Sequence, residues 1–168
     1  MPKTKGLTTM VATEALILDS ENVRTVLGSI EEVFNRGLVD RIPHYYAPDF
    51  ISHQGGWGIW DWLPGLDGMA THIGLTKAAW PDYTEYPEIV FGRGDIVAVR
   101  MTIAGTNTGD VYDTQGRLIF EATGKRFEVK DMMFCRVRDG KLVEQWGLTD
   151  NYSMLVELGL CDPLAPAQ

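Results

Sequence analysis

Apolar residues in the first part of the chain recur at helical spacing. Between residues 20 and 37 they stand three, four and seven positions apart, and Gly37 follows the last of them. This spacing predicts an amphipathic helix with one buried stripe, which begins after the candidate caps Asp19 and Ser20 and ends at the glycine. The stripe consists of Val23, Val26, Leu27, Ile30, Val33 and Phe34. The sequence then predicts a short helix or turn over residues 40–46, a short strand over 50–53 and a helix over 67–79.

The pattern changes at residue 85, where apolar and polar residues begin to alternate. Alternation with a period of two is typical of strands in antiparallel sheets. The predicted strands cover residues 85–91, 96–106, 118–123, 127–137 and 142–148, with glycine-containing turns between several of them. Because the helices come first and the hairpins second, the order of elements predicts an α+β fold rather than alternating βαβ units.

Two of these strands allow a prediction about the faces of the sheet. In the strand 96–106, one face is purely apolar, and the other carries Arg100 and Thr102. In the strand 127–137, alternation places Asp131 on one face with Phe127, Val129, Met133 and Cys135. We expect one face of the sheet to pack on helices and line a pocket, and the other to be partly covered by a partner subunit.

Length and composition favour a single acidic domain. The chain has 168 residues, which predicts a tail over 1–18, one domain over 19–160 and a second tail over 161–168. The net charge of −8 argues against partners such as nucleic acid or an anionic membrane surface. The two cysteines suggest no disulfide framework, and no metal-ligand spacing occurs among the cysteines or histidines, so we expect a cytoplasmic protein without a bound metal.

Several segments, taken in order, resemble the SnoaL-like polyketide cyclases of the nuclear-transport-factor-like superfamily. They are VFNRG (33–37), YAPDFISH (46–53), WPDY (80–83), GDIVAVRMTIAGTNTG (94–109) and RVRDGKLVEQWGLTDNYSMLVELG (136–159). The resemblance implies a cone-shaped, curled antiparallel or mixed sheet around a deep hydrophobic pocket, packed on N-terminal helices and followed by a C-terminal helix. It also implies a homodimer that needs no cofactor and closes a ring by an aldol-type step.

This sequence departs from the family pattern at two positions. Many relatives carry His or Asp where Met133 stands, and Asp or Asn where Gly147 follows Trp146. If the catalytic acid of the family directly follows the tryptophan, this chain lacks it. If the acid instead opens the final helix, Asp150 supplies it. Both alignments agree with the sequence.

Three residues are candidates for proton transfer. Asp150 is the leading candidate, and its alternative role is to cap the final helix, which ends at Gly159. Asp131 is the second candidate, because a carboxylate among apolar side chains has a raised pKa. Its alternatives are a solvated strand position and an ion pair with Arg100. His53 could shuttle a proton or donate to a carbonyl, or it could simply bond to the backbone.

The predicted substrate-binding residues are more varied. Arg100 could hold an enolate or a carboxylate through its planar donors, or it could form an ion pair in the sheet or at a dimer seam. The glycine-rich segment 54–65 contains three tryptophans that could shape a pocket entrance or serve only in packing. The full predicted set is Arg100, Tyr46, Trp57, Trp60, Trp62 and Met133.

These features lead to one functional hypothesis and two alternatives. The first is a cofactor-independent cyclase, isomerase or dehydratase that acts on a small hydrophobic, polyketide-like or ring-containing molecule. The second is a non-catalytic protein that binds a small ligand or serves in dimerisation. The third is an epoxide hydrolase-like enzyme that uses Arg100 between Asp131 and Asp150.

Overall fold

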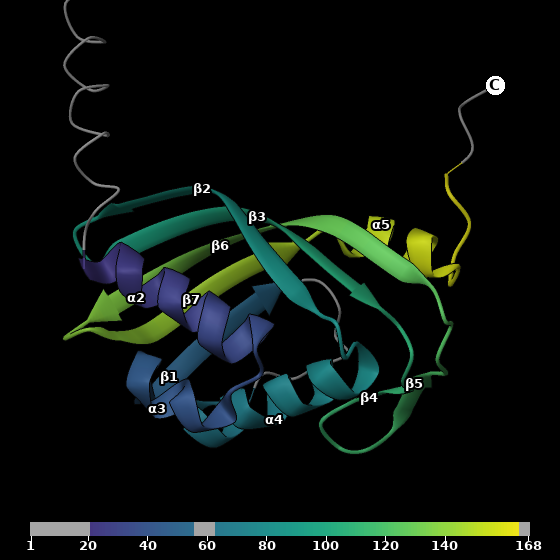
Figure 1. The fold of residues 1–168 in the computed structure, drawn as a ribbon, viewed down its shortest axis with the longest axis horizontal. Helices are drawn as coiled ribbons and strands as arrows, with labels where there is room; N and C mark the ends of the chain where they lie inside the picture. Colours follow the sequence, from purple (N-terminus) through teal and green to yellow (C-terminus); the bar gives the residue numbers. More distant parts are fainter. Residues whose placement is uncertain (1–20, 56–62, 165–168) are drawn as a thin grey trace, which may run out of the picture.

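The protein is a mixed sheet with helices on one of its faces (Figure 1). The computed structural model describes residues 21–55 and 63–164. The main sheet has the strand order β1-β7-β6-β3-β2, in which β1 runs parallel to β7 and all other neighbours are antiparallel. Its strands are β1 (Tyr46–Gly55), β2 (Thr84–Arg93), β3 (Ile96–Thr106), β6 (Arg126–Arg138) and β7 (Lys141–Thr149).

The helices lie mostly before the hairpins, as the sequence predicts. Helices α2, α3 and α4 cover one face of the sheet, and α5 packs beside β6 after the last strand (Figure 1). The α-helices are α2 (Glu21–Ser29), α3 (Ile42–Tyr45), α4 (Gly65–Ala79) and α5 (Asn151–Leu158). A π-helical segment, η1 (Ile30–Asn35), continues α2, and a 3-10 turn, η2 (Val39–Arg41), precedes α3. No helix in the described ranges has the length and apolar character needed to cross a membrane.

The α+β prediction is confirmed, and several boundaries differ from the predicted ones. Strand β1 is longer than predicted and begins at Tyr46, because the parallel pairing with β7 extends it in both directions. The predicted strand 118–123 is only β5 (Leu118–Phe120), which pairs with the unpredicted β4 (Val111–Tyr112) outside the main sheet. The predicted tail 1–18 and the candidate caps Asp19 and Ser20 lie outside the described residues.

Burial divides the main sheet into two different faces, which we call the inner and the outer face. The inner face packs on the helices, and its side chains on β3 are at most 4% exposed. Those side chains are Val97, Val99, Met101 and Ile103. The outer face of the neighbouring β6 includes Met132 and Phe134, which are 50% and 52% exposed. The predicted difference between the two faces is therefore present.

The π-helical segment connects the helical layer to the edge of the sheet. Asn35, its last residue, accepts a hydrogen bond through Oδ1 from the Glu85 backbone N at 2.7 Å and donates through Nδ2 to the Glu85 O at 3.0 Å. The Asn35 side chain thus satisfies two backbone groups of β2, which is the edge strand of the sheet formed by the described residues. A π-helical turn often marks a functional site, and here it positions this amide.

We expect Asn35→Ala to lower the free energy of unfolding by about 1–3 kcal/mol, because two backbone groups at the sheet edge lose their partner. Asn22→Ala is the matched control, since its amide makes one exposed hydrogen bond to Gly94 O at 2.9 Å. Urea denaturation of both variants measures the difference. Equal losses would show that the Asn35 link does not stabilise the edge of the sheet.

Candidate active site on the inner face of the sheet

Asp131 is a buried carboxylic acid in the middle of the inner face. It lies on β6, directly opposite Met101 of β3 and Thr149 of β7, and is 8% exposed. The Thr149 hydroxyl donates a hydrogen bond to Asp131 Oδ2 at 2.6 Å. Burial raises the pKa of Asp131, and the Thr149 hydrogen bond opposes this effect only in part. Neither alternative role from the sequence is observed, since Asp131 is neither solvated nor paired with Arg100.

Glu85 is a second buried acid on the same face, and sequence reasoning missed it. It lies on β2 opposite Ile103 and is 5% exposed. Its Oε1 accepts a hydrogen bond from the Tyr83 hydroxyl at 3.0 Å, and its Oε2 has no partner among the described residues. Burial, together with the negative charge of Asp131, raises the pKa of Glu85 to about 8. Glu85 is therefore mostly protonated at pH 7.

A break in the alternation of β2 explains why Glu85 was missed. Glu85 and Pro87 stand opposite the inner-face residues Ile103 and Met101, and a register shift after Pro87 places Ile89 opposite Arg100 on the outer face, where Glu88 also bonds. A strict period of two would put Glu85 on the same face as the exposed Pro87 and Ile89. The available signal was the Tyr83–Glu85 spacing, which places two groups that can bond to each other on one side of an extended chain.

Two predicted substrate-binding residues, Tyr46 and Met133, lie on this inner face. Tyr46 is 1% exposed, and its ring packs edge-on against Phe50 with centroids 4.8 Å apart. The Tyr46 hydroxyl makes no well-formed hydrogen bond among the described residues, and burial raises its pKa. Met133 is 4% exposed and stands between Val99 and Gly147. The inner face thus combines two acids and a phenol with apolar side chains.

Asp150, the leading candidate from the sequence, caps helix α5. Its Oδ1 accepts a hydrogen bond from the Ser153 backbone N at 3.1 Å, and its Oδ2 accepts from the Ser153 hydroxyl at 2.8 Å. These hydrogen bonds lower the pKa of Asp150, and the side chain is exposed. The helix then ends at Gly159, whose positive φ of 73° suits a left-handed cap. The geometry is that of a helix cap, the alternative role considered from the sequence.

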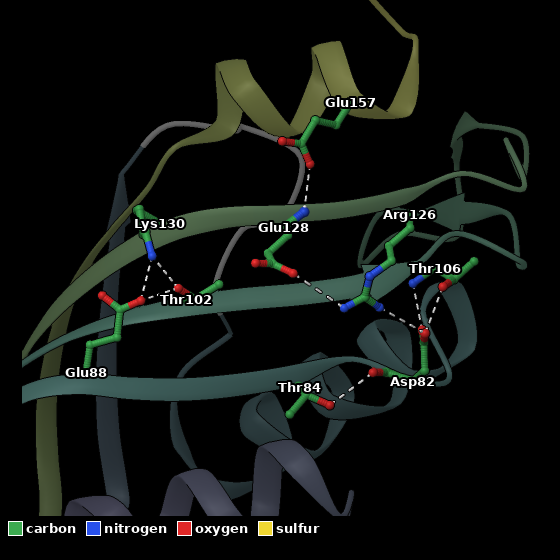
Figure 2. Close-up of polar contacts among 9 residues, drawn as sticks. All are labelled: Asp82, Thr84, Glu88, Thr102, Thr106, Arg126, Glu128, Lys130 and Glu157. Carbon is green, nitrogen blue, oxygen red and sulfur yellow. Dashed lines mark hydrogen bonds and ion pairs between the residues drawn. The ribbon is translucent and has the colours of Figure 1, made fainter.

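His53 and Arg100 lie on the outer face. His53 Nε2 is 3.0 Å from Glu144 Oε1, and its ring stacks on Trp146 with centroids 5.5 Å apart. Arg100 forms an ion pair with Glu88. Figure 2 shows the same Glu88 joined to Lys130 and Thr102 across β2, β3 and β6. These contacts support the ion-pair role for Arg100.

A groove of about 510 Å³ lies beside the middle of β6, where β7 ends and α5 begins. Arg100, Asp131 and Asp150 all contribute to its lining, but each carboxylate has a different partner and Arg100 bonds to neither. The carboxylate–Arg–carboxylate set of an epoxide hydrolase-like site is therefore not assembled.

Residues 21–55 and 63–164 contain no group of three His, Cys, Asp or Glu side chains that could hold a metal ion. Trp57, Trp60 and Trp62 lie outside the described residues.

The raised pKa of Glu85 predicts a specific dependence of stability on pH. The folded state holds this proton up to about pH 8, whereas an unfolded glutamate loses it near pH 4.5. The Glu85 contribution is therefore fully present below pH 4.5 and is lost as the pH rises to about 8. Compared with the wild type, Glu85→Gln should gain stability over this window, by about 1.4 kcal/mol for each unit of pKa shift.

Glu88→Gln is the control, because hydrogen bonds from Lys130 and Thr102 lower the pKa of Glu88 to about 2. Its contribution is present above pH 4.5 and is lost only as the pH falls toward 2. Urea denaturation from pH 3 to pH 9 measures both variants. A Glu85→Gln difference that stays constant with pH would contradict the burial of a protonated acid.

Comparisons with known proteins agree with this architecture. The family model of the SnoaL-like polyketide cyclases matches residues 24–158. TsrD from Streptomyces laurentii superposes with a TM-score of 0.70 at 22% identity, over 86% of this chain and 99% of TsrD. IdmH from Streptomyces antibioticus has a TM-score of 0.64 at 30% identity, over 83% of this chain and 99% of IdmH. A SnoaL-like polyketide cyclase from Agrobacterium tumefaciens has a TM-score of 0.64 at 17% identity, over 84% and 99% of the two chains.

No curated protein matches the sequence. The match to the family model nevertheless spans most of the chain, from α2 to the end of α5. The family and the related structures support an enzyme with a cyclase-type function. The chain therefore belongs to the SnoaL-like polyketide cyclase family.

Proposed function

We propose that this protein is a cofactor-independent acid/base enzyme that closes a ring in a small hydrophobic, polyketide-like substrate. Isomerisation and dehydration need the same kinds of proton transfer, so the proposal includes them as the two related reactions that this site could catalyse. The observation that carries it is Asp131, a buried acid with a raised pKa on the apolar inner face. A positioned group of this kind contributes about 10²–10⁴-fold to the rate of a proton transfer.

Asp131 acts in its ionised form as the base. It removes a proton from a carbon next to a substrate carbonyl, and the resulting nucleophilic carbon attacks a second carbonyl of the same molecule. The Thr149 hydroxyl, 2.6 Å from Asp131 Oδ2, holds the carboxylate in one orientation. The protonated Asp131 then returns the proton to the oxygen of the attacked carbonyl, which restores the base.

The substrate occupies a deep hydrophobic pocket over the inner face in this proposal. Tyr46 and Met133 support that location, because both side chains are buried on the face that carries Asp131. Trp57, Trp60 and Trp62 shape the entrance, as their position in a glycine-rich segment suggests. His53 and Arg100 have no direct role, since their contacts lie on the outer face.

Asp131→Asn should lower kcat/KM for a cyclised substrate by about 10²–10⁴-fold, because the amide cannot carry the proton. Asp150→Asn keeps a capping side chain and should leave turnover unchanged within about twofold. Steady-state kinetics on a panel of linear polyketide mimics measures both variants. Full activity of Asp131→Asn would contradict the role of Asp131 as the catalytic base. A large loss of activity in Asp150→Asn alone would indicate that Asp150 is the catalytic residue.

A non-catalytic ligand-binding protein is the second candidate, and one observation favours it. Met133 and Gly147 stand directly opposite each other on the inner face. The family resemblance implies His or Asp in many relatives where Met133 stands, and Asp or Asn where Gly147 stands. If the chain binds the mimics but the wild type converts none of them, this second candidate replaces the first.

We also propose that a second copy of the chain covers the outer face of the sheet. The outer face exposes six large apolar side chains, each 50–58% accessible, which leaves roughly 500 Å² of apolar surface. These are Tyr86, Ile89, Phe91, Met132, Phe134 and Leu148. An area of this size is at the upper end for a patch on a monomer and approaches the 800 Å² or so per partner of a standard interface.

Charge on the outer face also suits a second copy. The ion pairs Arg100–Glu88 and Arg136–Glu144 place both signs of charge among the apolar side chains. A two-fold contact requires one surface to complement itself, and a surface of mixed sign can do so.

Phe134→Glu should convert the dimer into a monomer, because it places a charge in the centre of the apolar area. Leu118→Glu is the matched control, since Leu118 is 50% exposed but lies on β5 outside the main sheet. Light scattering coupled to size-exclusion chromatography measures the mass of each variant. A monomeric wild type, or a Phe134→Glu variant that stays dimeric, would exclude this interface.

A further inference from the structure

The carboxyl group of Glu85 has one buried oxygen to which no described residue bonds. The residue is 5% exposed, and its Oε2 has no hydrogen-bond partner among the described residues. Buried polar atoms are nearly always paired, so an unpaired carboxyl oxygen calls for a reason. A leucine at this position would fill the space without the cost of burying a polar group. The carboxyl group is therefore better explained by a ligand than by packing.

Neighbouring residues hold Glu85 in a fixed position. Asn35 bonds to its backbone N and O, and the Tyr83 hydroxyl bonds to its Oε1 at 3.0 Å. Lys77 Nζ in turn donates to the backbone oxygens of Asn35 at 2.9 Å and of Tyr83 at 2.7 Å. Asn35 of η1 and Lys77 of α4 thus fix the surrounding backbone, and Tyr83, just before β2, fixes one carboxyl oxygen and leaves the other available. Such support is what a precisely placed acid requires.

Register relates Glu85 to Asp131. Glu85 is opposite Ile103, which is opposite Val129, and Val129 precedes Asp131 by two positions on β6. The two acids therefore share the inner face with only β3 between their strands, and their backbone positions are about 10 Å apart across the sheet and about 7 Å apart along it, or roughly 12 Å in total. The charge of Asp131 acts on Glu85. A substrate in the pocket proposed above would lie across β3 and contact both groups.

Other titratable groups surround Glu85. Burial disfavours the charged form of each of these groups, and among them the Lys77 ammonium lowers the pKa of Glu85 whereas the Asp131 carboxylate raises it. They are Lys77 of α4, Tyr46 of β1, Tyr83 just before β2, and Asp131 and Cys135 of β6.

We propose that Glu85 is a second catalytic residue, which protonates the carbonyl oxygen of a diketone substrate while Asp131 removes a proton from the adjacent carbon. This inference rests on the proposed function, because it assigns a partner to the base named there. It also names the substrate class as a molecule with two carbonyl groups, one of which has an adjacent C–H bond.

The protons and electrons balance over the cycle. Asp131 takes the proton of the C–H bond, the electron pair of that bond forms a C=C bond, and the carbonyl π pair takes the proton of Glu85. The resulting enol carbon attacks the second carbonyl carbon and forms the ring bond. As the first carbonyl re-forms, the enol O–H proton returns to Glu85. The oxygen of the attacked carbonyl takes the proton from Asp131, so both residues regain their starting states.

The test is a pH–rate profile with heptane-2,6-dione and aryl-substituted 1,5-diketones, which cyclise and lose water to give cyclohexenones that absorb ultraviolet light. In the wild type we expect kcat/KM to fall above about pH 8, where Glu85 loses its proton. Glu85→Gln should lower kcat/KM at pH 7 by about 10²-fold and remove this fall. Glu85→Asp should retain the fall and part of the rate. Glu88→Gln is the control, because Glu88 is also a carboxylate of β2 but makes its contacts on the outer face. This variant should match the wild type.

The outcomes separate the two proposals. If Asp131→Asn loses activity while Glu85→Gln keeps the wild-type rate and profile, Glu85 is a structural residue and only the further inference fails. If Asp131→Asn is fully active, the proposed function fails. Should Glu85→Gln not fold, Glu85→Asp decides, because a structural role predicts a lower melting temperature with an unchanged profile. A wild type that cyclises none of the diketones excludes the substrate class.

Discussion

Burial of one face of a pleated sheet is the constraint on which the rest of this structure depends. Once α2, α3 and α4 cover the inner face, every second residue of β6 from Phe127 to Val137 loses contact with water. Along β6 this alternation buries Asp131 among apolar neighbours and leaves Lys130 and Met132 outside. The free energy gained from the apolar side chains offsets the cost of dehydrating the acid. The chemistry of the site is thus a consequence of the packing.

Because of this burial, Asp131 and Glu85 differ from the charged residues of the outer face in the partners that they bond to. Carboxylates of the outer face have basic or hydroxyl partners, as Glu88 has in Lys130 and Thr102 (Figure 2) and in Arg100. Within the described ranges, Asp131 and Glu85 accept side-chain hydrogen bonds from hydroxyl groups, those of Thr149 and Tyr83, and Asp131 also accepts one from the Met132 backbone. A hydroxyl group cannot compensate for lost hydration as a cation does, so the neutral form of each acid is favoured. Groups of this kind recur in active sites that transfer protons near neutral pH.

Much of the fold followed from local patterns. The amphipathic stripe of α2, the limits of β3 and the inward position of Asp131 all depend on spacing within one segment, which a single sequence contains. Features that depend on distant partners did not follow. Strand β1 is lengthened by its pairing with β7, and a register shift against β3 separates the inward-facing Glu85 from the outward-facing Ile89. The role of Asp150 was also open in the sequence, since a helix cap and a catalytic acid use the same residue type.

Titration of the carboxyl carbons by ¹³C NMR tests the central claim most directly, because it measures the two inner-face acids without any substrate. With Asp131→Asn and Glu85→Gln used for assignment, we expect Glu85 to titrate near pH 8 and Asp131 above its ordinary value of 3.8. Exposed Asp150 should titrate below 3.8 in the same spectra. If Glu85 and Asp131 both titrate at the values of exposed carboxylates, the inner face does not dehydrate them, and the proposed acid/base site is wrong.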